Sequence, residues 1–96
     1  MAVYVDEAIW RSRGRRWCHL TADTPDELHA MAARLGVLRQ WFQSKPGQPW
    51  HDHYDLPEEL RAQAVACGAQ ELSTLEMGRR LAKARRATRL AGSSQP

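Results

Sequence analysis

Ninety-six residues, 43% of them hydrophobic and 26% charged, are enough for one small globular domain with a modest core. No apolar run is long enough for a transmembrane helix, and acids stand near the N-terminus where a signal peptide needs basic residues, so we expect a cytoplasmic protein without a membrane partner. The net charge of +3 conceals an asymmetry, because residues 78–96 carry six Lys and Arg and no acid, which leaves about −3 on residues 1–77.

The first third of the chain predicts two strands joined through a basic turn. Residues 2–6 are β-branched and aromatic, which is typical of a strand. Residues 11–16 read RSRGRR, and Gly14 marks a turn within this basic segment. Residues 17–22 are again aromatic and apolar, and they predict the second strand.

The clearest predicted element is a helix over residues 24–36. Thr24 suits the N-cap and Glu27, three positions later, completes a capping box. Apolar residues then recur at helical spacing until Gly36, which is a typical helix stop. The apolar and aromatic run at residues 37–43 predicts a third strand.

Similar signals recur in the second half of the chain. Residues 44–52 are rich in Pro, Gly and polar residues and predict a loop. Asp55, three positions before a glutamate, predicts the cap of a second helix that Gly68 ends. Residues 69–72 suggest a short strand, and Ser73 with Glu76 predicts a third helix through about residue 89.

These elements predict an α/β fold. Strands and helices alternate, which favours a single-domain sheet of about four strands, at least partly parallel, with two or three helices packed on it. The charge asymmetry divides the chain into a compact domain over residues 1–77 and a basic C-terminal helix with a frayed tail over residues 78–96. The tail itself is expected to begin at residue 91.

Local motifs along residues 2–75 resemble the bacterial and phage family known as domain of unknown function 4031. The motifs are Tyr4-Val5-Asp6, Trp17 with His19-Leu20, Asp23, Glu27-Leu28-His29, Leu35-Gly36, Phe42-Gln43, His53-Tyr54-Asp55 and Gly68-Ala69. The resemblance implies a small, stand-alone cytoplasmic domain. It implies no reaction, cofactor or site residue, because no activity is established for the family.

A divalent metal is one candidate cofactor. In an extended segment His51 and His53 point to the same side. The candidates for a third ligand are His19, Asp23, His29 and Asp55. Imidazole and carboxylate ligands together suit zinc, manganese or iron. Cys18 and Cys67 have no CxxC spacing, so they predict reduced, packed thiols rather than a zinc or redox pair.

A metal-free acid–base pocket is the second interpretation. His and Asp residues stand where strands end and helices begin, the place where α/β folds gather their sites. We expect this pocket to take a small anionic, phosphate- or nucleotide-like ligand, with at least three of the His and Asp side chains converging. The candidate catalytic residues are His19, Asp23, His29, His53 and Asp55, and the candidate ligand contacts are Arg15, Arg16, Arg61 and Tyr54.

Two further functions remain open on the residues alone. The Arg-rich segments 11–16 and 79–89 suit the phosphates of a nucleic acid, and the first is flanked by Trp10 and Trp17, which can stack on bases. No helix-turn-helix or zinc-finger pattern predicts sequence-specific binding. The basic helix is equally suited to docking a protein partner or a second copy of this chain.

Overall fold

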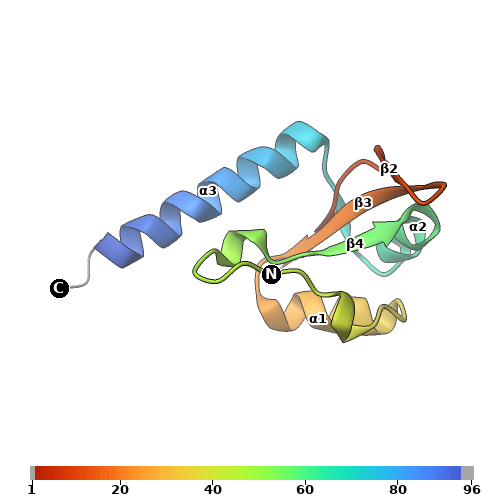
Figure 1. Ribbon diagram of the computed structural model, residues 1–96, viewed down its shortest axis with the longest axis horizontal. Helices are drawn as coiled ribbons and strands as arrows, with labels where there is room; N and C mark the ends of the chain where they lie inside the picture. Colours follow the sequence, from red (N-terminus) through yellow and green to blue (C-terminus); the bar gives the residue numbers. More distant parts are fainter. Residues whose placement is uncertain (1, 94–96) are drawn as a thin grey trace.

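The computed structural model describes residues 2–93, which form a mixed five-stranded sheet and three α-helices (Figure 1). This confirms the predicted α/β fold. The strands are β1 (Val3–Val5), β2 (Trp10–Ser12), β3 (Arg15–Ala22), β4 (Tyr54–Pro57) and β5 (Gln70–Glu71). The α-helices are α1 (Pro25–Arg34), α2 (Glu58–Ala66) and α3 (Thr74–Ser93), and two 3-10 turns, η1 (Arg39–Trp41) and η2 (Pro49–His51), lie between α1 and β4.

Strand β3 is the centre of the sheet. It pairs antiparallel with β1, with β2 and with β4. The β4 pairing overlaps both of the others in register, so β1 and β2 share one edge of β3 and β4 occupies the other. The predicted parallel pairing is the one between β1 and β5.

The two faces of β3 have different surroundings because side chains alternate along a strand. Cys18 and Leu20 are fully buried in the core, where α1 and α2 pack on the sheet. His19, between them in sequence, points to the opposite face and is partly exposed. Its cross-strand neighbour on β4 is Asp55, so the register of one strand pair brings an imidazole and a carboxylate together on this face.

The predicted capping boxes at two helices are confirmed. The Thr24 side chain accepts a hydrogen bond from the backbone N–H of Glu27 and donates one to its carboxylate. At α3, the backbone N–H of Glu76 donates to Ser73 Oγ, and the Ser73 backbone N–H donates to the Glu76 carboxylate. The Ser73–Glu76 box satisfies two backbone donors at the start of α3, and the Thr24 side chain satisfies one at the start of α1, donors that the first turn of a helix otherwise leaves without partners.

The predicted turn around Gly14 is a two-residue hairpin loop. Ser12 pairs with Arg15, and both residues between them have positive φ angles, 53° at Arg13 and 72° at Gly14. Two successive residues of this kind form the turn whose twist matches a β-hairpin. The sequence does not predict β2, because only one of its three residues, Trp10, is a typical strand residue and the other two belong to the basic segment around Gly14.

Two predictions about the middle of the chain are wrong. Residues 37–43 form no strand, since Arg39–Trp41 is a 3-10 turn and only Gln43 makes an isolated bridge, to His53. Asp55 is not a helix cap, because it lies inside β4 and the N-cap of α2 is Pro57, which makes no side-chain cap. Because β4 runs directly into α2, Asp55 stands at the distance from Glu58 that is typical of a helix cap although it lies in a strand.

Helix α3 leaves the body of the domain and gives the molecule its length of 47 Å against a width of 25 Å (Figure 1). Met77 is buried at its start, where its sulfur lies 3.4 Å from the Thr21 hydroxyl. The helix reaches Ser93, so residues 91–93 of the predicted frayed tail are helical, and residues 94–96 lie outside the described residues. None of the helices within residues 2–93 has the length and apolarity that crossing a bilayer requires.

The two thiols are expected to differ in reactivity. Cys18 is fully buried, and that burial raises its pKa to about 12, whereas Cys67 is partly exposed. At pH 8 the Cys18 thiolate is then about one part in ten thousand of the thiol. Iodoacetamide should modify Cys67 in the native protein and both cysteines in urea, as read by peptide mass spectrometry. Equal labelling of both thiols in the native protein would contradict this packing.

Candidate functional site

Three side chains converge on the sheet face opposite the core. They are His19 on β3, His53 between η2 and β4, and Asp55 on β4, and each offers one nitrogen or oxygen such that these atoms lie within 4.8 Å of one another. The imidazole rings of His19 and His53 meet edge to face at 5.4 Å. The expectation that at least three of the His and Asp side chains converge is therefore met by this trio, which we call the His/Asp group.

His19 is oriented by a buried carboxylate. Asp6 is only 2% exposed, and it accepts hydrogen bonds from the His19 backbone N–H at 2.6 Å and from the His19 ring Nδ1 at 2.8 Å. A carboxylate that accepts from Nδ1 holds the proton on that nitrogen. The other ring nitrogen, Nε2, is then left with its lone pair.

His53 is oriented in the same way by a different acceptor. Its Nδ1 lies 2.5 Å from the backbone carbonyl oxygen of His51. A carbonyl can only accept a hydrogen bond, so this nitrogen carries a proton. Nε2 of His53 lies 3.4 Å from Oδ1 of Asp55, and the other oxygen of Asp55 accepts from Gln43 at 2.7 Å.

Electrostatics couple His53 and Asp55. The interaction of its ring with the Asp55 carboxylate raises the pKa of His53 against the opposing effect of burial. The same interaction lowers the pKa of Asp55, and the Gln43 amide lowers it further. Asp55 is therefore an anion at neutral pH, 3.4 Å from Nε2 of His53 and within 4.8 Å of a ring nitrogen of His19. Such a group can ligate a cation or exchange a proton.

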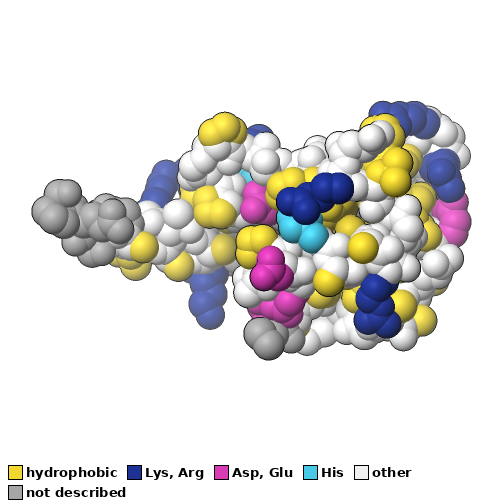
Figure 2. Space-filling model, turned by 90° about the horizontal axis from the view of Figure 1, so that it is seen from below, with side chains coloured by type: hydrophobic (Ala, Val, Ile, Leu, Met, Phe, Trp, Pro, Cys, Tyr) yellow, Lys and Arg dark blue, Asp and Glu magenta, His cyan; other side chains and the backbone are white. Residues whose placement is uncertain are grey.

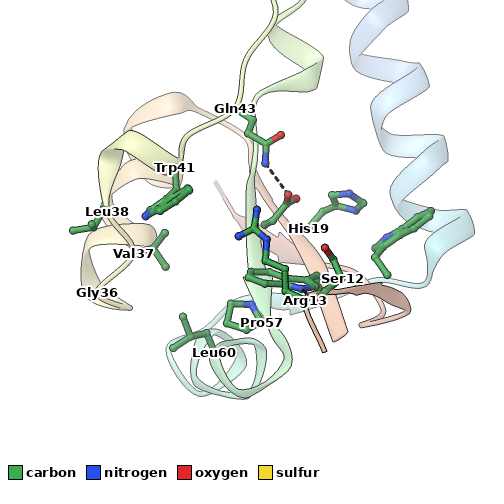
Figure 3. A pocket seen from close by; sticks show the side chains of 13 residues that line it. Ser12, Arg13, His19, Gly36, Val37, Leu38, Trp41, Gln43, Pro57 and Leu60 are labelled. Atoms are coloured by element: carbon green, nitrogen blue, oxygen red, sulfur yellow. Dashed lines mark hydrogen bonds between the residues drawn. The ribbon is translucent and has the colours of Figure 1, made fainter. Parts of the chain in front are cut away.

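A cavity of about 520 Å³ adjoins the group (Figure 3). His19, Asp55 and Gln43 contribute polar atoms to its wall. The rest of the lining is mostly apolar and comes from the β2–β3 hairpin, the segment after α1, and the β4–α2 junction. Its members are Trp10, Ser12, Arg13, Trp17, Gly36, Val37, Leu38, Trp41, Pro57 and Leu60.

Asp23 and His29, both candidate catalytic residues, are not among the atoms of the His/Asp group. Asp23 accepts hydrogen bonds from the Tyr4 hydroxyl and from Arg80. Burial acts to raise the pKa of Asp23, but these two partners outweigh it and hold the pKa below its usual value. The sequence predicts the site where strands end and helices begin. At that place Asp23 makes a structural contact with Tyr4 and Arg80, whereas His19 lies in the middle of β3.

His29 lies in an aromatic cluster. Its ring Nδ1 is 2.9 Å from the hydroxyl of Tyr54, and its ring packs edge-on against Phe42. Burial first, and Arg39 second, lower the pKa of His29, so the ring is neutral at pH 7. Tyr54 is 1% exposed and its side chain is part of the core, and the ligand contact expected of it stays a prediction.

Other predicted contacts have structural partners. His51 packs against Trp50 in η2 and is not in the group, and its role as a metal ligand beside His53 stays a prediction. Only its carbonyl takes part, through His53. Arg61 donates to the backbone carbonyl of Asp6 and to Glu71, which makes it a support of the Asp6 loop rather than a contact for an anion.

The basic segments do not join into one surface. Arg15 pairs with Glu59, and both line a second, polar hollow with Arg16, outside the cavity beside the His/Asp group. The β2–β3 hairpin and the projecting end of α3 lie at opposite ends of the molecule (Figure 1). Figure 2 shows Lys and Arg side chains spread over one face, at both ends and near its middle, with acidic, histidine and hydrophobic side chains between them.

Sequence reasoning missed several residues that build this site. The sequence marks Asp6 only as part of the Tyr4-Val5-Asp6 motif, and the pattern at residues 37–43 predicts Gln43 in a strand. Trp10, Trp17 and Trp41 line the cavity, although the high tryptophan content of so short a chain was a usable signal. Their spacing in sequence carries no hint of a shared wall, since it depends on how β2, β3 and the segment after α1 fold together.

Comparison with known proteins adds the family. The model of the family described as "Protein of unknown function (DUF4031)" matches residues 3–84. The match confirms the resemblance seen in the motifs, and it extends past them into the first half of α3. No curated protein and no solved structure matches this chain.

Proposed function

Because the chain belongs to the DUF4031 family, a family of unknown function, we propose its function from its own geometry: it binds a divalent transition-metal ion and presents that ion to a small ligand. The observation that carries the proposal is the fixed orientation of two imidazoles. Asp6 holds Nδ1 of His19 and the His51 carbonyl holds Nδ1 of His53. Nε2 of His53 therefore faces Asp55, 3.4 Å from its Oδ1, and Nε2 is the nitrogen of His19 that remains for a metal.

This arrangement is the one that metal-binding histidines use. A histidine that ligates a metal usually donates its other ring N–H to a carboxylate or a backbone carbonyl, which fixes the ring and strengthens the ligand. Both kinds of partner are present here, one for each ring. The 3.4 Å between His53 Nε2 and Asp55 Oδ1 also fits, since two ligands at about 2.1 Å in a tetrahedral site stand roughly 3.4 Å apart.

The ligand set indicates which ions fit. Two imidazole nitrogens and one carboxylate oxygen suit Zn²⁺, Fe²⁺, Co²⁺ and Mn²⁺ rather than Ca²⁺ or Mg²⁺, which prefer oxygen ligands. Three protein ligands leave one or more coordination positions open. His19 and Asp55 line the cavity, so the open positions face the space where a ligand fits. A metal there would act as a Lewis acid or activate a bound water.

A metal-free acid–base site is the alternative that the same residues allow. The His53–Asp55 pair and its raised imidazole pKa are sufficient for that chemistry. The metal is favoured because a proton-transfer pair needs only one imidazole. The group gathers two imidazoles and a carboxylate within 4.8 Å, which is a set of metal ligands.

Thermal unfolding with and without metal tests the proposal. At a free Zn²⁺ or Co²⁺ concentration 100 times the dissociation constant, binding stabilises the native state by about 2.7 kcal/mol. For a domain of this size that raises Tm by roughly 10–20 °C. Calorimetric titration of the metal-free protein should give one ion per chain.

The control is His51→Ala, which removes a neighbouring imidazole outside the group and keeps the carbonyl that holds His53. This variant should bind the ion as the unmodified protein does. Absence of a Tm shift with Zn²⁺, Co²⁺, Fe²⁺ and Mn²⁺ alike would refute the metal proposal. Loss of the shift in His51→Ala would place the ion elsewhere.

A further inference from the structure

We infer that the ligand of this site is a small molecule with a flat aromatic ring that carries an anionic group, a carboxylate or a phosphate. The inference deepens the proposed function and rests on it for the contact between the anionic group and the metal ion. The ring contact and the arginine contact stand on separate observations. Both concern the cavity beside the His/Asp group.

The first observation is that the aromatic and apolar side chains of the cavity wall are exposed to solvent. Trp10, Leu38 and Trp41 are 49%, 57% and 54% exposed, and all three line this one cavity. They are half of the six large hydrophobic side chains that residues 2–93 expose. Exposed apolar side chains that gather around one cavity, rather than scatter singly, mark a ligand surface.

Tryptophan gives that surface a shape preference. Trp17 is fixed by a hydrogen bond from its indole N–H to the Ser12 carbonyl, and Trp10 packs edge-on against His19. Trp41 approaches from the other side, on η1 (Figure 3). Flat faces of this kind favour offset or edge-to-face contact with another flat ring over a saturated one.

The second observation is a cation directed into the cavity. Arg13 occupies the hairpin turn with a φ of 53°, a conformation that non-glycine residues seldom adopt. Its side chain extends from the turn toward the middle of the cavity (Figure 3). No side chain or backbone group within residues 2–93 forms an ion pair or a hydrogen bond with this guanidinium.

The other arginines of the hairpin do not have this arrangement. Arg15 is already paired with Glu59, and Arg11 and Arg16 line the second hollow, where Glu58 supplies further negative charge. That hollow has no aromatic wall. A free guanidinium, an aromatic surface and the His/Asp group coincide only at the first of these two cavities, which has the volume of a small-ligand site.

An anion there has two cationic contacts. A carboxylate or phosphate can accept paired hydrogen bonds from Arg13, and a metal held by the His/Asp group supplies the second positive charge. The ring of the same molecule then lies against the tryptophans. The predicted ligand is thus recognised by ring, charge and metal together.

Three probe molecules, each titrated by calorimetry, separate the contribution of the flat ring to binding from that of the charge. 2-Naphthoate has both ring and charge, 2-naphthamide has the ring without the charge, and cyclohexanecarboxylate has the charge without the flat ring. Naphthoate should bind at least about tenfold more tightly than either of the others. Arg13→Gln should weaken naphthoate by about tenfold or more and naphthamide by less than about twofold, whereas Trp41→Ala should weaken both aromatic probes.

Matched controls lie close by. Arg11→Gln removes a cation from the same hairpin but from the other hollow. Trp50→Ala removes a partly buried tryptophan of η2 that packs on His51 and does not line the cavity. Neither should change naphthoate binding.

Each titration is run with EDTA and with Zn²⁺. Naphthoate binding that survives EDTA and depends on Arg13 supports the inference even where metal binding fails, and added Zn²⁺ should tighten it. Equal binding of the three probes, or no effect of Arg13→Gln on naphthoate, overturns the inference while the metal titration stands by itself.

Discussion

Replacing His53 with alanine is expected to weaken binding of Zn²⁺ or Co²⁺ by about 100-fold or more, because it removes one of three protein ligands. The substitution also frees Asp55 from its only imidazole partner at 3.4 Å. The backbone pairing of residue 53 with Gln43 does not depend on the side chain, so the fold should persist. The measurement is a calorimetric titration of the metal-free variant beside His51→Ala.

The His53→Ala and His51→Ala variants distinguish the loss of a metal ligand from a general effect on the segment that carries both residues. Both remove an imidazole from the same short segment, but only His53 contributes a ligand atom. If both variants bind the metal as tightly as the unmodified protein, the ion is not held by His53. If both lose it equally, the segment matters for folding and the ligand role of His53 is not supported.

Replacing the buried Asp6 with asparagine is expected to weaken metal binding by about 10- to 100-fold without touching a ligand. Asp6 accepts two hydrogen bonds, from the backbone N–H and from the ring Nδ1 of His19. Asparagine has one oxygen and one NH₂ group, so one of these two contacts becomes donor against donor. If the NH₂ group faces the ring, His19 must move its proton to Nε2, and that nitrogen can no longer ligate.

Nitrogen-15 NMR of the histidine rings separates this positioning role from simple damage to the fold. In the unmodified protein His19 should carry its proton on Nδ1, and in Asp6→Asn on Nε2. A stability loss of about 1 kcal/mol accompanies the change, because two hydrogen bonds to a carboxylate are replaced by weaker bonds to a neutral amide. Asp26→Asn, an exposed position in the first turn of α1, is the control. An unchanged His19 tautomer with unchanged metal affinity would contradict the role of Asp6.

Much of the fold could be predicted because the relevant signals are local. The Thr24–Glu27 and Ser73–Glu76 boxes both form as their spacing indicates, and Gly36 and Gly68 follow the helices that they end, with positive φ angles. Local signals failed where tertiary pairing decides. Strand β2 exists because it pairs with β3, and Asp55 resembles a helix cap in sequence although β3 holds it in a strand.

The site could be predicted only in part for the same reason. His19, His53 and Asp55 were identified by residue type, but their grouping depends on the pairing of His19 with Asp55 across two strands. Asp23 and His29 matched the expected positions at the starts of helices, and the fold uses them for contacts with Arg80 and Tyr54. Nothing local marks the buried Asp6, because its role depends on the β1–β3 register.

The most direct test is a crystal structure of the protein grown with Zn²⁺ or Co²⁺, with anomalous scattering recorded at the metal edge. The proposal predicts one anomalous peak at about 2.0–2.2 Å from Nε2 of His19, Nε2 of His53 and a carboxylate oxygen of Asp55, open toward the cavity. A structure with no peak at these three side chains, or with the ion bound through His51 or His29 instead, would contradict the metal centre.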